Sequence, residues 1–176
     1  MSVLVHKPSL KEPEVFQDRY RLYFYTVRYL LERVSWYCRD HRAPKDGGDG
    51  SAHVTFSNRA SMSYDELCDY LRRLEELSAA NDIRIDWNVI KPDQVEALTA
   101  GKRMGLQIAD AIASSFFNAV EPNQFGHTED RYARTMKPVV YNYKNRYLGY
   151  GVKLWPKEVA DGLAGDAHLA WTEAYK

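Results

Sequence analysis

Short runs of apolar and β-branched side chains predict the strands of this chain. Residues 2–6 (SVLVH) and 53–56 (HVTF) are runs of this kind, and the first is followed closely by Pro8. Residues 83–90 (IRIDWNVI) alternate apolar and polar side chains with the period of a half-buried strand, and Pro92 follows them. We therefore expect a strand at each of these places.

Longer stretches with an apolar side chain every three or four residues predict helices. The strongest signal covers residues 16–40, as in a long amphipathic helix. Ser63 and Glu66 have the spacing of a capping box, in which each side chain satisfies a free backbone N–H at the start of a helix. A further helix is expected from about 104 to 120, where small and apolar residues dominate.

The composition changes after Pro122, where tyrosine and basic residues become frequent. Residues 139–143 (VVYNY) and 147–155 (YLGYGVKLW) are separated by the polar residues 144–146, which predicts a C-terminal β-hairpin. Glycines weaken the helical pattern of residues 157–176, so this segment is expected to be a helical or loosely ordered tail.

The order of these elements predicts a layered α/β fold with partly parallel strands. A chain of 176 residues has the length of one domain. Open α/β sheets place ligand sites at the carboxyl ends of their strands, which draws attention to Asn58 and Arg59 after the 53–56 strand.

Charge and composition narrow the possible partners and compartments. The 24 basic and 24 acidic residues cancel, so the molecule as a whole attracts neither nucleic acid nor anionic lipid, although local basic patches remain open. Cys38 and Cys68 lack CxxC spacing and read as core residues of a reducing compartment. No apolar run approaches the roughly 20 residues of a membrane span, and no secretory signal is recognised. We therefore expect a cytoplasmic protein without a membrane partner.

Several common kinds of active site find no support in the sequence. The five histidines show neither HxxxH nor HExxH spacing, which argues against a zinc hydrolase. The chain also has no GxGxxG, Walker loop or GxSxG motif, which removes the usual dinucleotide, nucleoside triphosphate and serine hydrolase interpretations.

A polar stripe crosses the apolar helix expected at 104–120. Gln107, Asp110 and Ser114 are three and four residues apart and must share one face of a helix. One interpretation is a face in contact with water. The other is that Asp110 is a metal ligand, since magnesium prefers carboxylates and water, although a single aspartate is insufficient.

Two further polar groups allow a structural and a functional interpretation. Arg28 and Glu32 are four residues apart and could form an ordinary surface ion pair, or Glu32 could supply a second carboxylate. Asn58 and Arg59 have ordinary turn chemistry after a strand. Alternatively, Asn58 supplies a neutral oxygen ligand and Arg59 binds a phosphate.

The expected hairpin combines aromatic faces with positive charge. Lys144 and Arg146 lie among several tyrosines and Trp155, as in proteins that bind single-stranded nucleic acid by stacking and phosphate contacts. Aromatic residues are also a usual filling of β surfaces, so a purely structural role stays open.

Four segments resemble a known family. "YRLYFYTVRYLLERVSWYC", "HVTFSNR", "GLQIADAIASSFF" and "RYLGYGVKLWP" are similar to the bacterial and phage proteins grouped as the domain of unknown function 3800 family, for which an RNase H-like fold is expected. The resemblance covers nearly the whole chain to Pro156, and its most specific element is "GLQIAD". It implies a three-layer RNase H-like domain over residues 1–156, followed by the tail 157–176.

The resemblance also implies site residues. Metal-dependent phosphodiester cleavage in such folds would give Glu32 the role of the first-helix carboxylate and Asp110 that of the late-helix carboxylate, both as ligands of Mg²⁺ or Mn²⁺. Asn58 would stand at the end of the fourth strand, where such sites normally have aspartate. Gln107 would be the neighbour of Asp110 and contact substrate. The phosphate-binding groups suggested above by the strand end and the hairpin, Arg59, Lys144 and Arg146, would complete the substrate contacts.

The beginning of the chain departs from the family pattern. Full-length relatives begin with a strand that carries an Asp-Glu-Ser type motif, so this chain is expected to begin at the third strand of the fold, with the first two absent. A homodimer or a second chain would then complete the sheet. The resemblance therefore implies a protein related to predicted metal-dependent nucleases, with weak or lost hydrolysis. The alternative is a non-catalytic nucleic-acid-binding or protein-assembly module.

Overall fold

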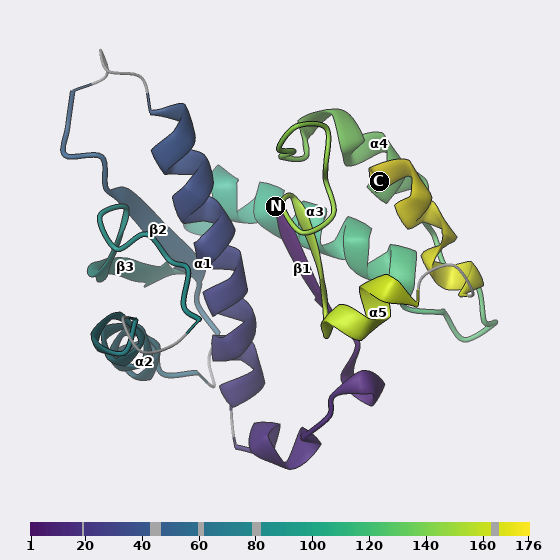
Figure 1. The fold of residues 1–176 in the computed structure, drawn as a ribbon, viewed down its shortest axis with the longest axis horizontal. Coiled ribbons are helices and arrows are strands. Elements are labelled where there is room, and N and C mark those ends of the chain that lie inside the picture. The colour runs from purple at the N-terminus through teal and green to yellow at the C-terminus, as the bar shows by residue number, and fades with distance from the viewer. Residues whose placement is uncertain (19, 43–46, 60–61, 79–81, 163–165) are drawn as a thin grey trace. The chain divides into compact units, whose positions relative to one another are not determined.

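The computed structural model describes residues 1–18, 20–42, 47–59, 62–78, 82–162 and 166–176. The chain forms two compact units. The central unit is Phe16–Gln107, and the terminal unit combines Met1–Val15 with Ile108–Lys176. Figure 1 labels their α-helices and most of their strands. Both units contain helices and a small parallel sheet, so the fold is mixed α/β as the element order predicted.

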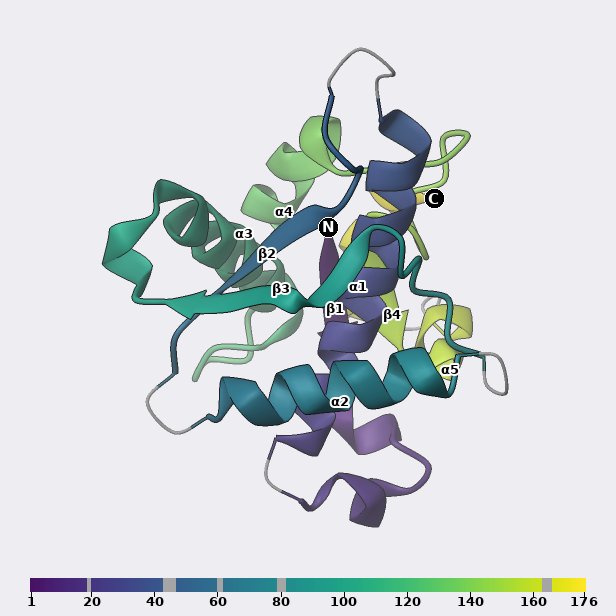
Figure 2. The same ribbon diagram turned by 90° about the vertical axis from the view of Figure 1, so that its left-hand side faces the viewer.

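The central unit is built on a strand–helix–strand arrangement. Strand β2 (Ala52–Ser57) and strand β3 (Ile90–Leu98) are parallel and hydrogen-bonded, and α2 (Tyr64–Glu76) connects them in sequence (Figure 2). Helix α1 (Arg21–His41) adds a further large apolar face to the faces of α2 and the two strands. Their side chains form one core, whose buried members include Phe24, Val27, Leu31, Leu67, Leu71, Leu74 and Ile90.

The local signals for the helices of the central unit are confirmed. Helix α1 covers most of the 16–40 stretch, and α2 begins directly after Ser63. The Ser63 hydroxyl accepts a hydrogen bond from the backbone N–H of Glu66 at 3.3 Å, which satisfies one of the free donors at the helix start. Strand β2 also lies where the sequence placed it.

The strand expected at residues 83–90 is wrong. This segment is irregular, and the strand β3 begins only at Ile90. Side chains of α1 hold the segment instead: Ser35 Oγ accepts from the N–H of Asp86 at 3.0 Å, and Trp36 Nε1 donates to the carbonyl of Arg84 at 2.7 Å. The ladder shifts its register between Ala52 and Val54, so Pro92 is accommodated in an irregular part of the pairing.

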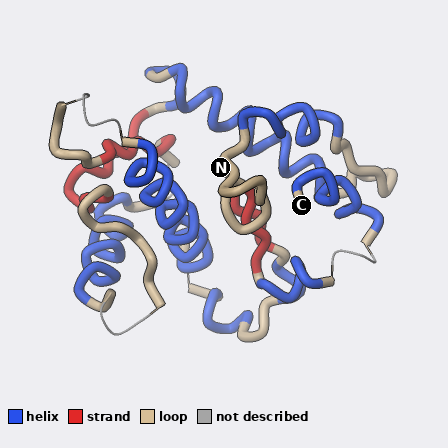
Figure 3. Tube along the Cα trace, turned by 45° about the horizontal axis from the view of Figure 1, so that its top comes forward, coloured by secondary structure: helices blue, strands red, loops and turns tan. Residues whose placement is uncertain are grey.

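The terminal unit contains the second parallel pair. Strand β1 (Ser2–Val5) pairs with β4 (Val152–Trp155) in the register Ser2↔Val152 to Val5↔Trp155, and Figure 3 shows the two as neighbouring red segments. Around them lie α3 (Met104–Val120), which continues from the central unit, α4 (Arg131–Met136) and the 3-10 helix η4 (Lys137–Val139).

The expected C-terminal hairpin does not form, although its turn and the end of its second strand, β4, lie where the sequence placed them. Residues 139–142 form no strand, and β4 pairs with β1. A tight turn does form at residues 143–146, closed by a single antiparallel bridge between Tyr143 and Arg146. The sequence pattern predicted that the strand β4 pairs with the nearby residues 139–143, but its partner in the structure is β1, which is distant in the chain.

The tail is helical, and its aromatic residues are firmly packed. It contains α5 (Lys157–Asp161) and the 3-10 helix η6 (Ala167–Tyr175). Trp171 and Tyr175 expose 1% and 0% of their surface and pack against Phe116 of α3. The tail therefore belongs to the core of the terminal unit, and the expectation of a loosely held segment does not apply to residues 166–176.

Candidate functional site

A tight turn in the terminal unit presents polar and basic side chains to solvent. Lys144 and Asn145 have φ angles of 51° and 64°, the positive values that a two-residue hairpin turn requires. The N–H of Tyr143 donates to the carbonyl of Arg146 at 3.1 Å, and the reverse bond measures 3.0 Å. Lys144, Asn145 and Arg146 are all exposed at its tip.

Tyrosine rings lie directly behind the turn. The rings of Tyr143 and Tyr150 have centroids 5.3 Å apart with an interplanar angle of 32°, and Tyr150 meets Tyr141 edge-on at 6.3 Å. Tyr143 keeps 42% of its surface exposed. A supported but accessible aromatic face of this kind is suited to stacking against a planar ligand.

Cations lie against these rings. The ammonium nitrogen of Lys144 is 5.3 Å from the ring centroid of Tyr143, and that of Lys137 is 5.0 Å from Tyr147. Both distances are within the range of cation–π attraction. We call Lys137, Tyr143, Lys144, Arg146 and Tyr147 the tyrosine turn.

The cations of the tyrosine turn differ from their neighbours in having no acidic partner. Arg134 pairs with Asp130 at 2.9 Å, and Arg131 pairs with Glu129, whose pKa it lowers to about 2. Among the described residues, Lys137, Lys144 and Arg146 form no ion pair with a carboxylate. Their charge is therefore available to an anionic ligand.

The polar stripe on α3 forms as the spacing predicted. Gln107, Asp110 and Ser114 are all exposed. Asp110 has no ion pair or hydrogen bond to another side chain within the described part of the chain. The stripe is in contact with solvent, and the Asp110 carboxylate is open to a ligand from solution.

Glu32 lies in a different setting from that of a surface ion pair. It exposes 3% of its surface, and its two carboxylate oxygens accept hydrogen bonds from Arg28 Nε and Arg33 Nη1, each at 3.2 Å. The backbone N–H of Arg84 approaches Oε1 at 3.4 Å. The Arg28–Glu32 pair expected from the sequence exists, but its carboxylate is buried and its guanidinium is half-buried.

Burial explains why these charges are paired so thoroughly. A carboxylate removed from water is costly unless cations and hydrogen bonds compensate it. Arg33 is buried as well, and this burial lowers the pKa of its guanidinium, while the charge of Glu32 acts in the opposite direction. The rings of Tyr29 and Trp36 lie 5.6 and 5.2 Å from the Arg33 guanidinium carbon. Glu32 can bind a metal ion only if these pairs break.

Asn58 and Arg59 follow β2 at the carboxyl end of the parallel pair, and both are exposed. The backbone N–H of Asn58 extends the ladder by donating to the carbonyl of Leu98 at 2.7 Å. The guanidinium carbon of Arg59 lies 5.4 Å from the ring centroid of Tyr23. These contacts place the two residues at the carboxyl end of the parallel strands, as the sequence predicted.

The expected metal ligands are distributed over the two units. Glu32 and Asn58 belong to the central unit and Asp110 to the terminal unit. Across the described ranges, no group of three or more histidine, cysteine, aspartate or glutamate side chains is arranged to hold a metal ion. Of these expected ligands, Asp110 is exposed, whereas Glu32 is buried and paired within its own unit.

Sequence reasoning missed Lys137 in the tyrosine turn. Its partner Tyr147 is ten positions away in the chain, which is no helical or strand spacing. The one available signal was the coincidence of several basic residues and tyrosines between 137 and 150.

Comparisons with known proteins give no neighbour for this chain. No family model, no curated protein and no solved structure matches it. In the part of the chain that is described, no helix has both the length and the apolar character needed to cross a membrane.

Proposed function

We propose that this chain binds single-stranded nucleic acid through the tyrosine turn. The observation that carries the proposal is a set of cations, Lys137, Lys144 and Arg146, that have no acidic partner among the described residues and lie beside an exposed tyrosine ring. Single-strand binders combine aromatic rings for base stacking with positive groups that follow the phosphates. The exposed turn at residues 143–146 presents an aromatic ring and two positive groups on one short segment.

Stacking accounts for the preference for single strands. Bases in a duplex are stacked on one another, whereas a single strand can place a base on the Tyr143 ring. Such stacking contributes about 1–3 kcal/mol per base. The underlying Tyr150 ring supports Tyr143, so little side-chain freedom is lost on binding.

Fluorescence anisotropy with labelled oligonucleotides tests the proposal. The probes are RNA and DNA strands of about 12 nucleotides, within the usual site sizes of single-strand binders, and the corresponding duplexes. We expect Tyr143→Ala to weaken single-strand binding by about tenfold, which corresponds to about 1.4 kcal/mol.

Tyr132→Ala is the matched control for this experiment. Tyr132 exposes 57% of its surface on α4 of the same unit, outside the tyrosine turn. Its removal should leave affinity unchanged. Equal losses in the two variants, or equal binding of duplex and single strand, would contradict the proposal.

A second proposal is metal-dependent phosphodiester hydrolysis, which the family resemblance implies. The exposed and unpaired Asp110, with Gln107 on the same face, favours it. Mg²⁺ or Mn²⁺ would be the cofactor, and such ions hold and polarise phosphate oxygens when bound. Glu32 does not fit the role of a ligand while Arg28 and Arg33 occupy its oxygens.

Cleavage assays separate the two proposals. If the chain is a nuclease, labelled strands should be cut in Mg²⁺ or Mn²⁺, and Asp110→Asn should abolish cutting without changing binding. Ser115→Ala, a change on α3 at a hydroxyl that bonds only its own helix backbone, is the control. Binding without turnover in wild-type protein would leave the binding proposal and exclude the enzyme.

A further inference from the structure

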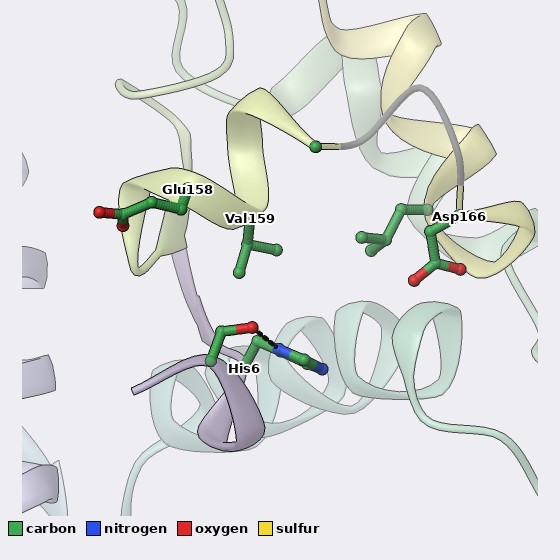
Figure 4. A pocket seen from close by; sticks show the side chains of 7 residues that line it. His6, Glu158, Val159 and Asp166 are labelled. Carbon is green, nitrogen blue, oxygen red and sulfur yellow. Dashed lines mark hydrogen bonds between the residues drawn. The ribbon is translucent and has the colours of Figure 1, made fainter. Parts of the chain in front are cut away.

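A small pocket in the terminal unit lies apart from the tyrosine turn. It lies between the N-terminal turn η1 (Lys7–Ser9), α5 and the start of η6 and is open to solvent, and Figure 4 shows its side chains. The cavity volume is about 250 Å³, which is below the roughly 300–1,000 Å³ of sites for drug-sized ligands. Its lining residues are His6, Ser9, Glu158, Val159, Gly162, Asp166 and Leu169.

One wall of the pocket is the imidazole ring of His6, which is hydrogen-bonded at one of its two nitrogens. His6 Nδ1 and Ser9 Oγ are 2.6 Å apart, a short hydrogen bond within the same turn. In Figure 4 this bond is made by the ring nitrogen next to Ser9, and the opposite side of the ring, with Nε2, extends into the space below Val159. Nε2 has no hydrogen-bond partner among the described residues.

The opposite wall carries the carboxylate of Asp166, of which one oxygen accepts a hydrogen bond from the described residues and the other does not. Asp166 caps η6, since its Oδ1 accepts from the backbone N–H of His168 at 2.9 Å. Its Oδ2 has no partner within the described ranges. Val159 and Leu169 supply the apolar surface between these two polar groups.

The net charge of the lining is negative. Glu158 is neutralised by Lys11, with Nζ and Oε1 2.5 Å apart, and Figure 4 shows its carboxylate directed away from Val159. Within the described part of the chain, Asp166 has no such cation, and no lysine or arginine is among the lining residues. An anionic ligand would meet an unpaired carboxylate, whereas a cation would be attracted.

We propose that this pocket binds a small aliphatic ammonium group, either a free amine or the end of a lysine side chain. The ammonium donates to Asp166 Oδ2 and to His6 Nε2, and its alkyl chain lies on Val159 and Leu169. His6 can accept from the ammonium because its Nδ1–H can donate to the hydroxyl of Ser9. In that tautomer the lone pair of His6 Nε2 faces the ligand. The four-carbon stem of lysine has a length that suits so small a cavity.

Backbone-amide NMR titration with n-butylammonium tests this inference. Butanol and butyrate, at matched ionic strength, are the neutral and anionic comparison probes. We expect saturable shifts around the pocket for the ammonium alone. Asp166→Asn keeps an oxygen for the cap and removes the charge, so it should weaken binding by about tenfold, as expected for a charged hydrogen bond.

Asp161→Asn is the matched control, because Asp161 is an exposed aspartate of α5 that does not line the pocket. A comparison of butylammonium with a lysine blocked at both backbone ends distinguishes the sources. Tighter binding of the blocked lysine assigns the site to a peptide, and equal or weaker binding assigns it to a free amine. Absence of saturation, equal response to butanol, or equal affinity of the two aspartate variants would overturn the inference.

Discussion

The carboxylate of Glu32 and the guanidinium of Arg33 are neighbours in sequence and pair inside the central unit, with Oε2 and Nη1 3.2 Å apart. Their side chains expose only 4% and 6% of their surface. Arg28 completes the pairing on the other oxygen of Glu32, and the N–H of Arg84 joins α1 to the irregular segment before β3. This contact is structural, because it fixes a segment that has no ladder of its own.

Replacing Glu32 should therefore affect folding. Glu32→Gln leaves Arg28 and Arg33 without their negative partner, and we expect a loss of about 3–5 kcal/mol in the free energy of unfolding, as for other broken buried pairs. Urea unfolding followed by circular dichroism measures it. Asp40→Asn, which breaks an exposed pair with Arg39, should cost no more than about 1 kcal/mol. Similar small losses in both variants would show that Glu32 is not structural.

Gly151 allows the chain to pass close to itself before β4. A Cβ at this position would lie 2.0 Å from the carbonyl oxygen of Tyr141, which is backbone and cannot easily move. Gly151→Ala should destabilise the protein by about 1–3 kcal/mol, the usual cost of overpacking. Thermal unfolding gives the comparison with Gly105→Ala, at a helical glycine with open space around it. There alanine should be neutral or stabilising, so equal destabilisation would argue against the close approach.

Tyr175 links stability to alkaline pH. Burial raises its pKa from 10.0 to about 12, and its hydroxyl donates to the carbonyl of Ala133. The folded state therefore holds the proton more tightly than the unfolded chain. This contribution is complete below pH 10 and is lost as the pH rises towards about 12.

Tyr175→Phe removes that titrating group. The variant should lose stability less steeply than wild type across the alkaline range, as measured by urea midpoints at a series of pH values. Tyr132→Phe, at an exposed tyrosine of the same unit, should follow wild type. A Tyr175→Phe curve parallel to wild type would contradict the assignment.

The elements that sequence reasoning located correctly depend on local interactions. The periodic apolar faces of α1, α2 and α3 and the Ser63 cap are set by residues a few positions apart. The strand expected at 83–90 failed because Ser35 and Trp36, about fifty positions earlier, take up its backbone groups. The alternating apolar side chains of that segment, among them Ile85 and Val89, pack into the core of the central unit.

The same distinction holds for the candidate site. Lys144 and Arg146 could be named from the sequence because a turn and its residues are adjacent in the chain. The burial of Glu32 could not be predicted in this way. The four-residue spacing between Arg28 and Glu32 indicates that the two side chains can pair, but it contains no information about the contact with Arg84. Pairing of β4 with β1, almost the whole chain apart, was equally beyond a local pattern.

The salt dependence of single-strand binding tests the central claim most directly. Each phosphate neutralised on a single strand contributes about −0.7 to the slope of log K against log salt concentration. The Lys144→Gln, Arg146→Gln double variant should therefore have a slope smaller in magnitude by about 1.4 than wild type. Arg131→Gln, at a cation already paired with Glu129, should keep the wild-type slope. An unchanged slope in the double variant would show that the tyrosine turn does not contact the phosphates.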